Sequence, residues 1–448
     1  MSSSRNIVII GGGVSGLSAA YYLSKSGIRA TLIEAQPSLG GTIRTESIDG
    51  CTVEGGPDSF LAAKPWALDL IRDLGLEDQV IGSRDSLRRT LIWKGERLVP
   101  FPDGMQLMVP TRIGPVLSSR LLSARTKWRM GMDLFRRPRT YPDRSVSEFI
   151  GDHFGQEAVD YIAEPLLAGV YGGDPAELSA PSVLPKFVEY ESKYGSLSRG
   201  VIENRKRSEG PIFQTLKDGL GQWIDALRGK LDPASIIQGR AETVEPGRVR
   251  VNGEWLAADQ TILACGANVS ASLLTGALSS VLSAIPYSSA VIVALGFRRS
   301  AFQHPAKGFG FLVPKRERKR LMACTWVGNK FPFRTPDDMT LLRCFFGGNP
   351  AEGDEQMVAW AMEELGTILG LRAQPVFSRV NRWPNSMPQY TVGHASRMAE
   401  LQYELRGRPG LHLIGNAYSG IGLPDCVRLA KQTAESIIAS PYSPEASS

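Results

Sequence analysis

The sequence predicts a mixed α/β and α+β fold, in which a dinucleotide-binding βαβ unit is combined with a strand-rich region and a helical region. Three observations lead to this prediction. The chain starts with an apolar strand, the pattern Gly11-x-Gly13-x-x-Gly16 and a second apolar strand that ends at Glu34. Residues 285 to 348 contain repeated β-branched and aromatic runs. Residues 105 to 205 are rich in helix-compatible and basic residues and contain no second βαβ pattern.

The βαβ unit has each component that dinucleotide binding requires. Residues 7 to 10 are a short β-branched run, as expected for a strand buried on both faces. Gly11 permits the tight turn, Gly13 lets the backbone approach a pyrophosphate, and Gly16 allows the helix to pack closely on the strand. The helix N-terminus offers free N–H groups to the phosphates. Glu34, eighteen residues after Gly16, places a carboxylate where ribose hydroxyls bind. A glycine-rich turn without a ligand is the alternative.

A second glycine pair, Gly40-Gly41, indicates which dinucleotide is bound. It is similar to the second flavin motif of the amine-oxidase-like flavoproteins, in which a basic residue usually comes next. Here Thr42 comes next, and Arg44 stands two places further on. Adjacent glycines again allow the backbone to lie close to a ligand. Together, the two motifs favour FAD over NAD.

Composition is that of a soluble globular protein of two or three domains. The chain has 448 residues, of which 42% are hydrophobic and 21% are charged. No apolar run reaches the roughly 18 residues of a membrane-spanning helix. The first strand begins too close to Met1 for a signal peptide, and the five cysteines stand far apart without a CxxC pair. We therefore expect a reduced, cytoplasmic protein.

The net charge of +6 is compatible with an anionic membrane surface or an acidic substrate. No nucleic-acid motif accompanies it, so we expect no nucleic-acid partner. In the basic region, an apolar stripe recurs at helical spacing and is surrounded by basic residues. The stripe is Leu121, Ala124, Trp128, Met132 and Phe135, and the basic residues are Arg120, Arg125, Lys127, Arg129, Arg136 and Arg137. Such a stripe can lie in a membrane interface, or it can pack on its own domain with a solvated basic face.

Between the βαβ unit and the basic region, a strand enters a glycine-rich loop at Gly56-Pro57-Asp58-Ser59. This loop can place N–H groups and a hydroxyl against a flavin ring, although a tight turn with a helix cap explains the same residues. A helix is expected over residues 64 to 74 and two short strands within residues 84 to 102.

Beyond the basic region, strand and helix signals alternate. Glycines in residues 164 to 175 predict a helix end followed by a loop, residues 213 to 221 open a helix, and residues 235 to 251 predict two strands. Residues 260 to 267 predict a buried strand that returns beside the first βαβ unit. Further elements are expected as strands at 290–297, 309–314, 322–327 and 341–346 and as a helix at 356–369.

The C-terminus carries a third glycine cluster. A strand from Leu411, a glycine-rich loop that begins at Gly415 and a helix through Ile438 follow one another. This order repeats the strand, loop and helix of the first unit. We therefore expect a discontinuous flavin-binding domain that is built from the N-terminus, a middle segment and the last sixty residues.

Seven stretches, spread almost from end to end, carry a family resemblance. They are residues 11–16, 40–41, 54–60, 164–174, 323–326, 382–394 and 415–427. In these stretches the chain resembles the porphyrinogen oxidases of haem synthesis, which comprise protoporphyrinogen oxidases and coproporphyrinogen III oxidases within the amine-oxidase flavoprotein superfamily. The first two stretches are common to many flavoproteins, whereas the last three are far more specific.

The resemblance implies three domains. A Rossmann-like FAD-binding domain would comprise residues 1–80, 205–268 and 390–448. A substrate-binding domain with an antiparallel sheet would comprise residues 81–104 and 269–389. A helical, membrane-contacting domain would comprise residues 105–204.

The resemblance also implies non-covalent FAD and the residues that bind it. These are Gly11, Gly12, Gly13, Val14, Ser15, Gly16, Glu34, Ala35, Gly41, Thr42, Gly56, Pro57, Asp58, Ser59, Glu242, Trp383, Gly415, Ile421, Gly422 and Leu423. Glu242 would contact the adenine through its backbone, at a position where the family usually has valine. Cys426 raises the possibility of a covalent flavin, but its neighbours do not match that pattern and a buried structural thiol is expected.

Four residues match substrate positions of the family. Arg89 resembles the arginine that pairs with a substrate propionate, although an exposed, solvated arginine is the alternative. Gly169, Leu312 and Phe345 match positions that flank the macrocycle. No acid–base dyad stands in the motif segments, so no catalytic base is assigned. No metal site is predicted, and His394 and His412 are expected to be structural.

The implied reaction is FAD-dependent oxidation of a porphyrinogen to the porphyrin. Six electrons leave in three flavin cycles, and O2 is reduced to H2O2. Residues 323–326 and 387–394 resemble the bacterial branch that takes coproporphyrinogen III, whereas Arg89 is more typical of the branch that takes protoporphyrinogen IX. Another FAD-dependent amine oxidase and a non-catalytic flavoprotein are the alternatives. Implied partners are the porphyrinogen, O2, an anionic membrane surface on the inner face of the cytoplasmic membrane, and ferrochelatase or another haem-pathway enzyme.

Overall fold

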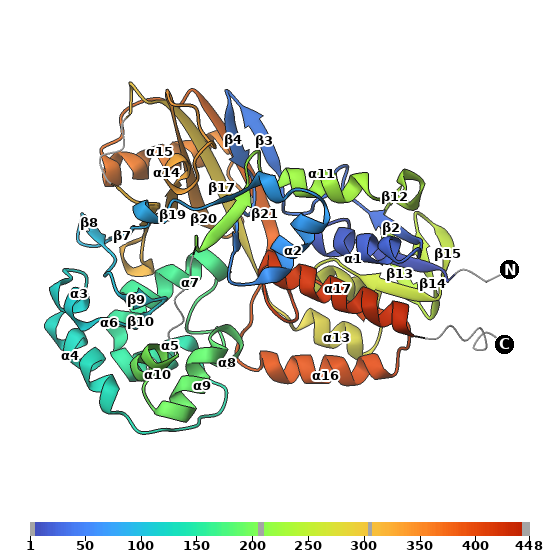
Figure 1. Cartoon of the computed structure of the whole chain (residues 1–448), viewed down its shortest axis with the longest axis horizontal. Coiled ribbons are helices and arrows are strands. Elements are labelled where there is room, and N and C mark those ends of the chain that lie inside the picture. Colours follow the sequence, from blue (N-terminus) through green and yellow to red (C-terminus); the bar gives the residue numbers. More distant parts are fainter. Residues whose placement is uncertain (1–4, 205–209, 303–306, 441–448) are drawn as a thin grey trace.

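The computed structural model describes residues 5–204, 210–302 and 307–440. Figure 1 shows three parts. The first, beside both termini, is built on a parallel sheet. The second is a larger sheet with one long helix on it. The third is a group of short helices at the end of the molecule opposite the termini.

The parallel sheet has five strands in the order β12-β2-β1-β16-β22. Its strands are β1 (Ile7–Ile10), β2 (Ala30–Glu34), β12 (Ile236–Gln238), β16 (Gln260–Leu263) and β22 (Leu411–Leu413). The predicted strand at 260–267 is confirmed, because β16 pairs in parallel with β1. Strands from three distant parts of the chain therefore share one sheet.

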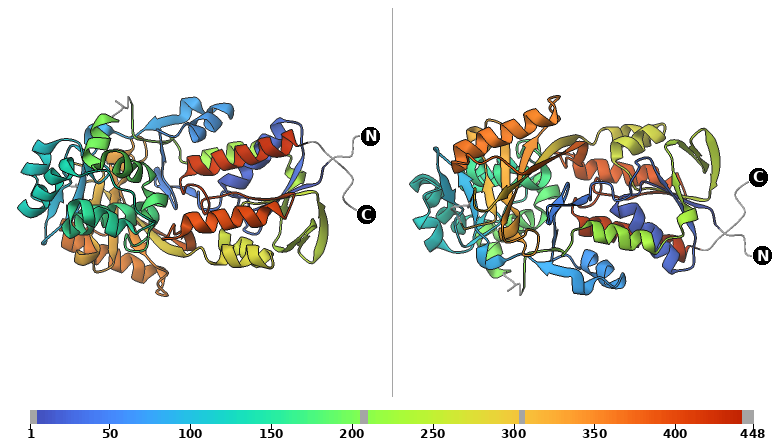
Figure 2. Two further views of the ribbon diagram at one scale, coloured as in Figure 1. Left: turned by 90° about the horizontal axis from the view of Figure 1, so that it is seen from below. Right: turned by 90° about the horizontal axis from the view of Figure 1, so that it is seen from above.

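Helices cover both faces of this sheet, as Figure 2 shows. On one face, Ile7, Ile9 and Leu32 pack against helices α1 (Val14–Lys25), α2 (Pro65–Asp73), α11 (Gly221–Gly229) and α17 (Leu423–Ala439). The alternate residues Val8, Ile10 and Ile33 pack against α12 (Ala267–Leu273), α13 (Ala277–Ser283) and α16 (His394–Arg406) on the other face. This alternation explains why the first strands read as continuous apolar runs.

Short strands surround the parallel sheet. They are β3 (Thr45–Ile48) with β4 (Cys51–Glu54), β5 (Phe60–Leu61) and β6 (Val80–Gly82) with β11 (Phe213–Leu216), and β13 (Ala241–Glu245), β14 (Gly247–Val251) and β15 (Glu254–Ala258). Two expectations were wrong here. Residues 213–216 are a strand and the helix begins only at Gly221, because Gly219, at φ 110°, turns the chain first. Residues 235–251 form three strands, not two, because the second and third pair through a tight turn.

The larger sheet has seven strands in the order β21-β17-β20-β19-β18-β7-β8. They are β7 (Thr90–Trp93), β8 (Leu98–Pro100), β17 (Tyr287–Arg298), β18 (Gly310–Leu312), β19 (Leu321–Trp326), β20 (Met339–Gly347) and β21 (Phe377–Pro388). The sheet is mixed and not wholly antiparallel as expected, because β18 pairs with β7 in parallel. These two strands are far apart in the sequence, so no hairpin forces them to run in opposite directions. The helix α15 (Asp354–Leu369) packs on one face.

The helical part contains α3 (Ile113–Ser118), α4 (Ala124–Met132), α5 (Val146–Phe154), α6 (Gln156–Ala158), α7 (Glu164–Tyr171), α8 (Ala180–Val183), α9 (Pro185–Tyr194) and α10 (Leu197–Glu203), after the short strands β9 (Met105–Gln106) and β10 (Val109–Pro110). The helix α7 continues through Gly169 and ends at Gly172, which has left-handed backbone angles. The predicted helix end and loop are therefore displaced toward Gly172. None of the helices that the described residues form is long and apolar enough to span a bilayer.

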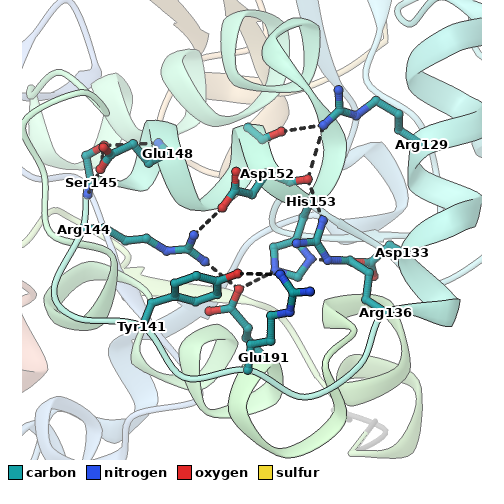
Figure 3. Close-up of polar contacts among 12 residues, drawn as sticks. Arg129, Asp133, Arg136, Tyr141, Arg144, Ser145, Glu148, Asp152, His153 and Glu191 are labelled. Carbon is teal, nitrogen blue, oxygen red and sulfur yellow. Dashed lines mark hydrogen bonds and ion pairs between the residues drawn. The ribbon is translucent and has the colours of Figure 1, made fainter.

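A buried polar cluster holds the helical part together (Figure 3). His153 on α5 lies between the carboxylates of Asp133 and Glu191, and Arg144 forms an ion pair with Glu191 at 2.5 Å. Asp133 also accepts hydrogen bonds from the Ser196 hydroxyl and the Ser198 N–H. The cluster joins the end of α4 to α5, α9 and α10 without leaving a carboxylate unpaired.

Candidate cofactor and substrate site

The loop between β1 and α1 has the close contacts that its glycines were predicted to allow. Gly11 has φ 111° and donates its N–H to the Ile33 carbonyl. A Cβ atom at Gly16 would lie 1.9 Å from the Gly11 carbonyl oxygen, so only glycine fits there. By contrast, a Cβ atom at Gly13 would meet its nearest protein atom at 3.9 Å. Gly13 therefore faces space that the protein itself does not fill.

Glu34 lies at the end of β2 and contacts this loop directly. Its carboxylate accepts hydrogen bonds from the Gly12 N–H at 2.6 Å and from the Gln36 N–H at 2.7 Å. Each carboxylate oxygen has a second lone pair, so Glu34 can still accept a bond from a ribose hydroxyl. The neighbouring Ala35 is exposed.

The start of α1 is suited to a phosphate. Its N-cap residue is Gly13, no side chain among the described residues caps the helix, and its first turn contains no acidic residue. Val14, Ser15 and Gly16 are nevertheless buried. Free N–H groups at a buried helix N-terminus need an acceptor, and a pyrophosphate supplies one. The residues present thus fit a dinucleotide.

The second glycine pair packs on the first motif. Gly40 donates its N–H to the Gly12 carbonyl at 2.8 Å, and a Cβ atom at Gly41 would lie 3.2 Å from the Gly13 Cα atom. Thr42 extends this wall, because a Cβ atom at Gly56 would lie 1.8 Å from the Thr42 carbonyl oxygen. Three predicted cofactor segments therefore form one continuous cradle of backbone.

Trp383 on β21 closes the cradle from the larger sheet. Its indole N–H donates to the Gly55 carbonyl at 2.7 Å, and the Arg44 guanidinium lies 5.1 Å from the centre of its ring. Arg44 in turn accepts the Gly55 N–H at its carbonyl. Arg44, three residues after Gly41, thus lies against the Trp383 ring. Pro57, Asp58 and Ser59 continue the loop beside Trp383.

The C-terminal glycine loop completes the arrangement. The Tyr390 hydroxyl donates to the Asn416 carbonyl at 2.8 Å and accepts the Gly420 N–H at 2.9 Å. Gly422 is the N-cap of α17, which no side chain among the described residues caps, and α17 packs beside α1. Two helix N-termini therefore point into one region. Of the other predicted residues, Gly415 has φ 133°, Ile421 packs against the helical part, and Leu423 begins α17.

Glu242 is placed near the cradle through its backbone segment. The Gly239 N–H donates to the Glu34 carbonyl at 2.8 Å, which brings residues 239–242 alongside the end of β2. The Glu242 carboxylate accepts the Gly253 N–H at 2.8 Å and pairs with Arg250 at 3.2 Å. Its side chain is thus engaged in the neighbouring hairpin, and the register of β13 with β14 skips Glu242.

Three of the four predicted substrate residues lie on one face of the larger sheet or against it. In the strand register, Leu312 pairs with Ala323 and Ala323 pairs with Phe345, so their side chains share a face. The opposite face packs against α15. A Cβ atom at Gly169 would lie 3.8 Å from Leu312 Cδ2, so α7 lies against the Leu312 end of this row. Trp383 also lies on this face, because it pairs with Ala290 in the next row.

Arg89 lies at the edge of this arrangement. It immediately precedes β7, whose Ile92 pairs with Leu312, and its carbonyl accepts the Phe309 N–H at 2.9 Å. Its side chain is exposed and forms no ion pair with any described residue. The structure thus anchors the backbone of Arg89 beside the row and leaves the guanidinium free for a ligand.

The sequence alone did not reveal a buried ionic cluster beneath the cradle. Asp58 accepts hydrogen bonds from Lys330 Nζ at 2.8 and 3.0 Å and lies 3.1 Å from Arg343 Nη1. Arg343 interrupts the apolar strand β20, and such an interruption is the one sequence signal that points to a buried partner. Lys330 carries no such signal.

Titratable side chains near the cradle are mostly paired. Asp425, at the start of α17, forms an ion pair with Lys64. Cys426 is buried, and burial raises the pKa of its thiol to about 11. A thiol of this kind is a poor nucleophile. His394 stacks on Tyr390 at 4.0 Å, and burial lowers the pKa of its imidazole to about 4. The described residues contain no group of His, Cys, Asp or Glu side chains able to hold a metal ion.

Comparisons with known proteins agree with this geometry. The model of the family described as "Flavin containing amine oxidoreductase" matches residues 14–438. A protein of Bacillus subtilis named coproporphyrinogen III oxidase is 34% identical over 95% of this chain and 96% of its own length. The human protoporphyrinogen oxidase is 29% identical over 97% of this chain and 98% of its own.

Solved structures show the same relationship. The crystal structure of a protein from Exiguobacterium, titled as a putative protoporphyrinogen oxidase, superimposes with a TM-score of 0.88 at 32% identity and covers 98% of this chain and 99% of its own. A UDP-galactopyranose mutase superimposes with a TM-score of 0.74 at 18% identity, over 97% of this chain and 96% of its own, which shows a shared fold alone.

Proposed function

Because the chain belongs to the family of flavin-containing amine oxidoreductases, we propose that it is an FAD-dependent porphyrinogen oxidase, with coproporphyrinogen III as its preferred substrate. One observation carries the choice of reaction: similarity to named porphyrinogen oxidases over nearly the whole length of the chain, at 34% identity for the Bacillus subtilis protein, in a chain whose glycine segments form one cofactor cradle. The choice of coproporphyrinogen rests on the bacterial relatives, such as those of Bacillus subtilis and Staphylococcus aureus, which carry that name.

The residues of the cradle would hold FAD without a covalent bond. The N-terminus of α1 would bind the pyrophosphate, Glu34 the ribose, and the backbone near Glu242 the adenine. The loop around Gly56 and the start of α17 would lie against the isoalloxazine. When bound, FAD supplies a two-electron acceptor, so that loss of six electrons from a porphyrinogen takes three rounds with O2 as the oxidant. The protein contributes binding and orientation.

The row of Leu312, Ala323 and Phe345 would support the macrocycle. These side chains are apolar and partly or fully buried, and Gly169 adds no side chain beside Leu312 at the end of the row. A flat, apolar macrocycle gains from such a surface because it removes apolar area from water. Arg89 would bind a propionate at the rim through a bidentate guanidinium–carboxylate contact.

No side chain is assigned as a general base. The acidic residues of the cradle are engaged: Glu34 by two backbone N–H groups, Asp58 by Lys330 and Arg343, and Asp425 by Lys64. Lys330 and Arg343 outweigh the effect of burial and lower the pKa of Asp58, which makes this carboxylate a weak base. The pyrrole proton would therefore leave to solvent or be lost by tautomerisation.

We also propose peripheral contact with an anionic membrane through the helical part. Four large apolar side chains there are exposed: Leu117 (56%), Trp128 (66%), Met132 (44%) and Phe135 (75%). Arg120 and Arg125 are exposed beside them. Leu121 of the predicted stripe is instead fully buried, because it precedes α4 and packs inside the helical core. A surface of this composition suits the interface of a bilayer. Such contact would place the protein on the cytoplasmic face, where it could pass its product to another haem-pathway enzyme such as ferrochelatase.

Side-by-side turnover of coproporphyrinogen III and protoporphyrinogen IX tests the proposal. Porphyrin fluorescence should rise with either substrate, with a higher kcat/KM for coproporphyrinogen, and three H2O2 should form per porphyrin. Equal or higher kcat/KM for protoporphyrinogen would reverse the substrate preference. If neither porphyrinogen reduces the bound flavin under anaerobic conditions, the protein is instead another amine oxidase or a non-catalytic flavoprotein.

A further inference from the structure

Two positively charged side chains converge on one carboxylate beneath the Gly55–Ser59 loop. Lys330 Nζ lies 2.8 Å and Arg343 Nη1 lies 3.1 Å from the oxygens of Asp58. The three side chains are 13%, 2% and 18% exposed, respectively. Because the site is largely shielded from water, its charges are screened much less than charges on the surface.

The cluster also fixes the loop mechanically. Besides its ion pair with Asp58, Arg343 donates a hydrogen bond to the Gly56 carbonyl, and Lys330 donates to the Ser59 hydroxyl at 3.2 Å. Lys330 ends the short helix α14 (Val327–Lys330), and Arg343 lies in β20. Both cations therefore come from the larger sheet and its connections, whereas the loop follows β4 at the edge of the cofactor cradle.

The charges of the cluster do not cancel. Asp58 supplies one negative charge, and Lys330 and Arg343 supply two positive charges. Burial alone would raise the pKa of Asp58, but the two neighbouring cations outweigh it and lower the pKa, so the carboxylate stays ionised. The nearest buried acid on the preceding strand, Glu54, is already paired with Arg334 at 2.9 Å. One positive charge is thus left over behind the loop.

We propose that the Asp58–Lys330–Arg343 cluster sets the reduction potential of the bound flavin. It would hold the Gly55–Ser59 loop in place and keep one uncompensated positive charge behind it. Reduction adds negative charge to a flavin, and a fixed positive charge nearby favours that state. This inference rests on the flavin-binding part of the proposed function and not on the identity of the substrate.

Substitutions of the two partners of the ion pair should shift the flavin potential in opposite directions, which separates an effect of charge from an effect of structure. Lys330→Met removes a positive charge, so the midpoint potential of the flavin should fall. Sulfite, an anion that adds to flavins more tightly near positive charge, should bind about tenfold more weakly. Asp58→Asn removes the negative charge, so the potential should rise and sulfite should bind more tightly. Loss of structure would move both variants in the same direction.

Arg298→Gln is the matched control, because it breaks an exposed ion pair with Asp338 on the same sheet. Purified holoprotein would be titrated with reference dyes for the potential and with sulfite for the adduct. Shifts of Lys330→Met and Asp58→Asn in the same direction, or no larger than that of Arg298→Gln, would overturn the proposal.

A further pair keeps the test decisive if Asp58→Asn does not fold with two unpaired buried cations. Lys330→Arg keeps the charge and should retain the wild-type potential, whereas Lys330→Met should lower it. Equal lowering in both variants would assign Lys330 a packing role only. All of these readouts use the flavin itself, so they remain informative even if the protein oxidises neither porphyrinogen.

Discussion

His153 Nδ1 lies 2.5 Å from Asp133 Oδ1, and both side chains are completely excluded from solvent. The other ring nitrogen, Nε2, lies 3.0 Å from Glu191 Oε1. Since ionised carboxylates only accept hydrogen bonds, both ring nitrogens must donate, and the imidazole must be protonated. Arg144 and Arg136 also face this cluster, together with the rings of Phe149 and Phe154.

This geometry predicts stability that depends on pH. Burial lowers the pKa of His153, but its hydrogen bonds to Asp133 and Glu191 outweigh this, so the pKa is raised above 6.5. The raised pKa means that the stabilisation is fully present below about 6.5 and is lost as the pH rises through the pKa of the folded state. His153→Gln should therefore lower the free energy of unfolding by on the order of 3 kcal/mol at mildly acidic pH. The loss should become progressively smaller at alkaline pH.

Thermal or urea unfolding of wild type and His153→Gln across this pH range measures the difference in free energy of unfolding between the two proteins. His412→Gln is a matched control, because His412 is partly buried, faces Gln260 and has no carboxylate partner among the described residues. A difference in free energy of unfolding that stays constant or increases toward high pH would contradict a protonated His153.

Gly13→Ala separates folding from FAD binding. The protein leaves 3.9 Å around a Cβ atom at this position, so the variant should fold with nearly wild-type stability. The added methyl group would occupy space that the pyrophosphate needs, at a cost of roughly 1–3 kcal/mol in FAD affinity. Fluorescence titration of the apoprotein with FAD measures this loss. Gly131→Ala, in α4 with nothing within 4 Å, should leave the affinity unchanged. Unaltered FAD affinity in Gly13→Ala would place the pyrophosphate elsewhere.

Arg89→Ala should raise KM for the porphyrinogen more than it lowers kcat. The guanidinium would contact a propionate that is remote from the bonds being oxidised, so its removal weakens binding before and during the reaction alike. A charge-assisted contact is worth about 1.5–3 kcal/mol, which corresponds to a rise in KM of at least tenfold. The neighbouring exposed arginine provides the control, since Arg88→Ala should change KM little. If Arg89→Ala leaves KM at its wild-type value for both porphyrinogens, Arg89 does not belong to the substrate site.

Membrane contact should depend on the exposed aromatic side chains of the helical part. Trp128→Ala combined with Phe135→Ala should reduce co-sedimentation with vesicles that contain anionic lipid, and the binding of the wild type should weaken with added salt. Tyr403→Ala is the control, because Tyr403 is 69% exposed on α16, which lies far from α4 in Figure 1. If the wild-type protein stays in the supernatant at low salt, the helical part does not contact membranes and is a soluble cap.

The sequence by itself determined the elements whose geometry is local. The first βαβ unit, the helix after residue 64, the strand that begins at Gln260 and the C-terminal strand, loop and helix are all present where they were predicted. Each depends on a short-range property: apolar periodicity, or a glycine that alone can adopt the required backbone angles or contact. The same properties identify the flavin-binding family.

Only the tertiary structure decided which distant residues meet. Asp58 lies 272 residues before Lys330 in the chain, and Gly56 lies 287 residues before Arg343. The parallel pairing of β18 with β7 and the burial of Leu121 were likewise absent from any local pattern. A buried ion pair forms when folding brings two opposite charges into the same shielded site. Which charges meet depends on the order and register of strands that lie hundreds of residues apart in the chain, and no short stretch of sequence carries this information.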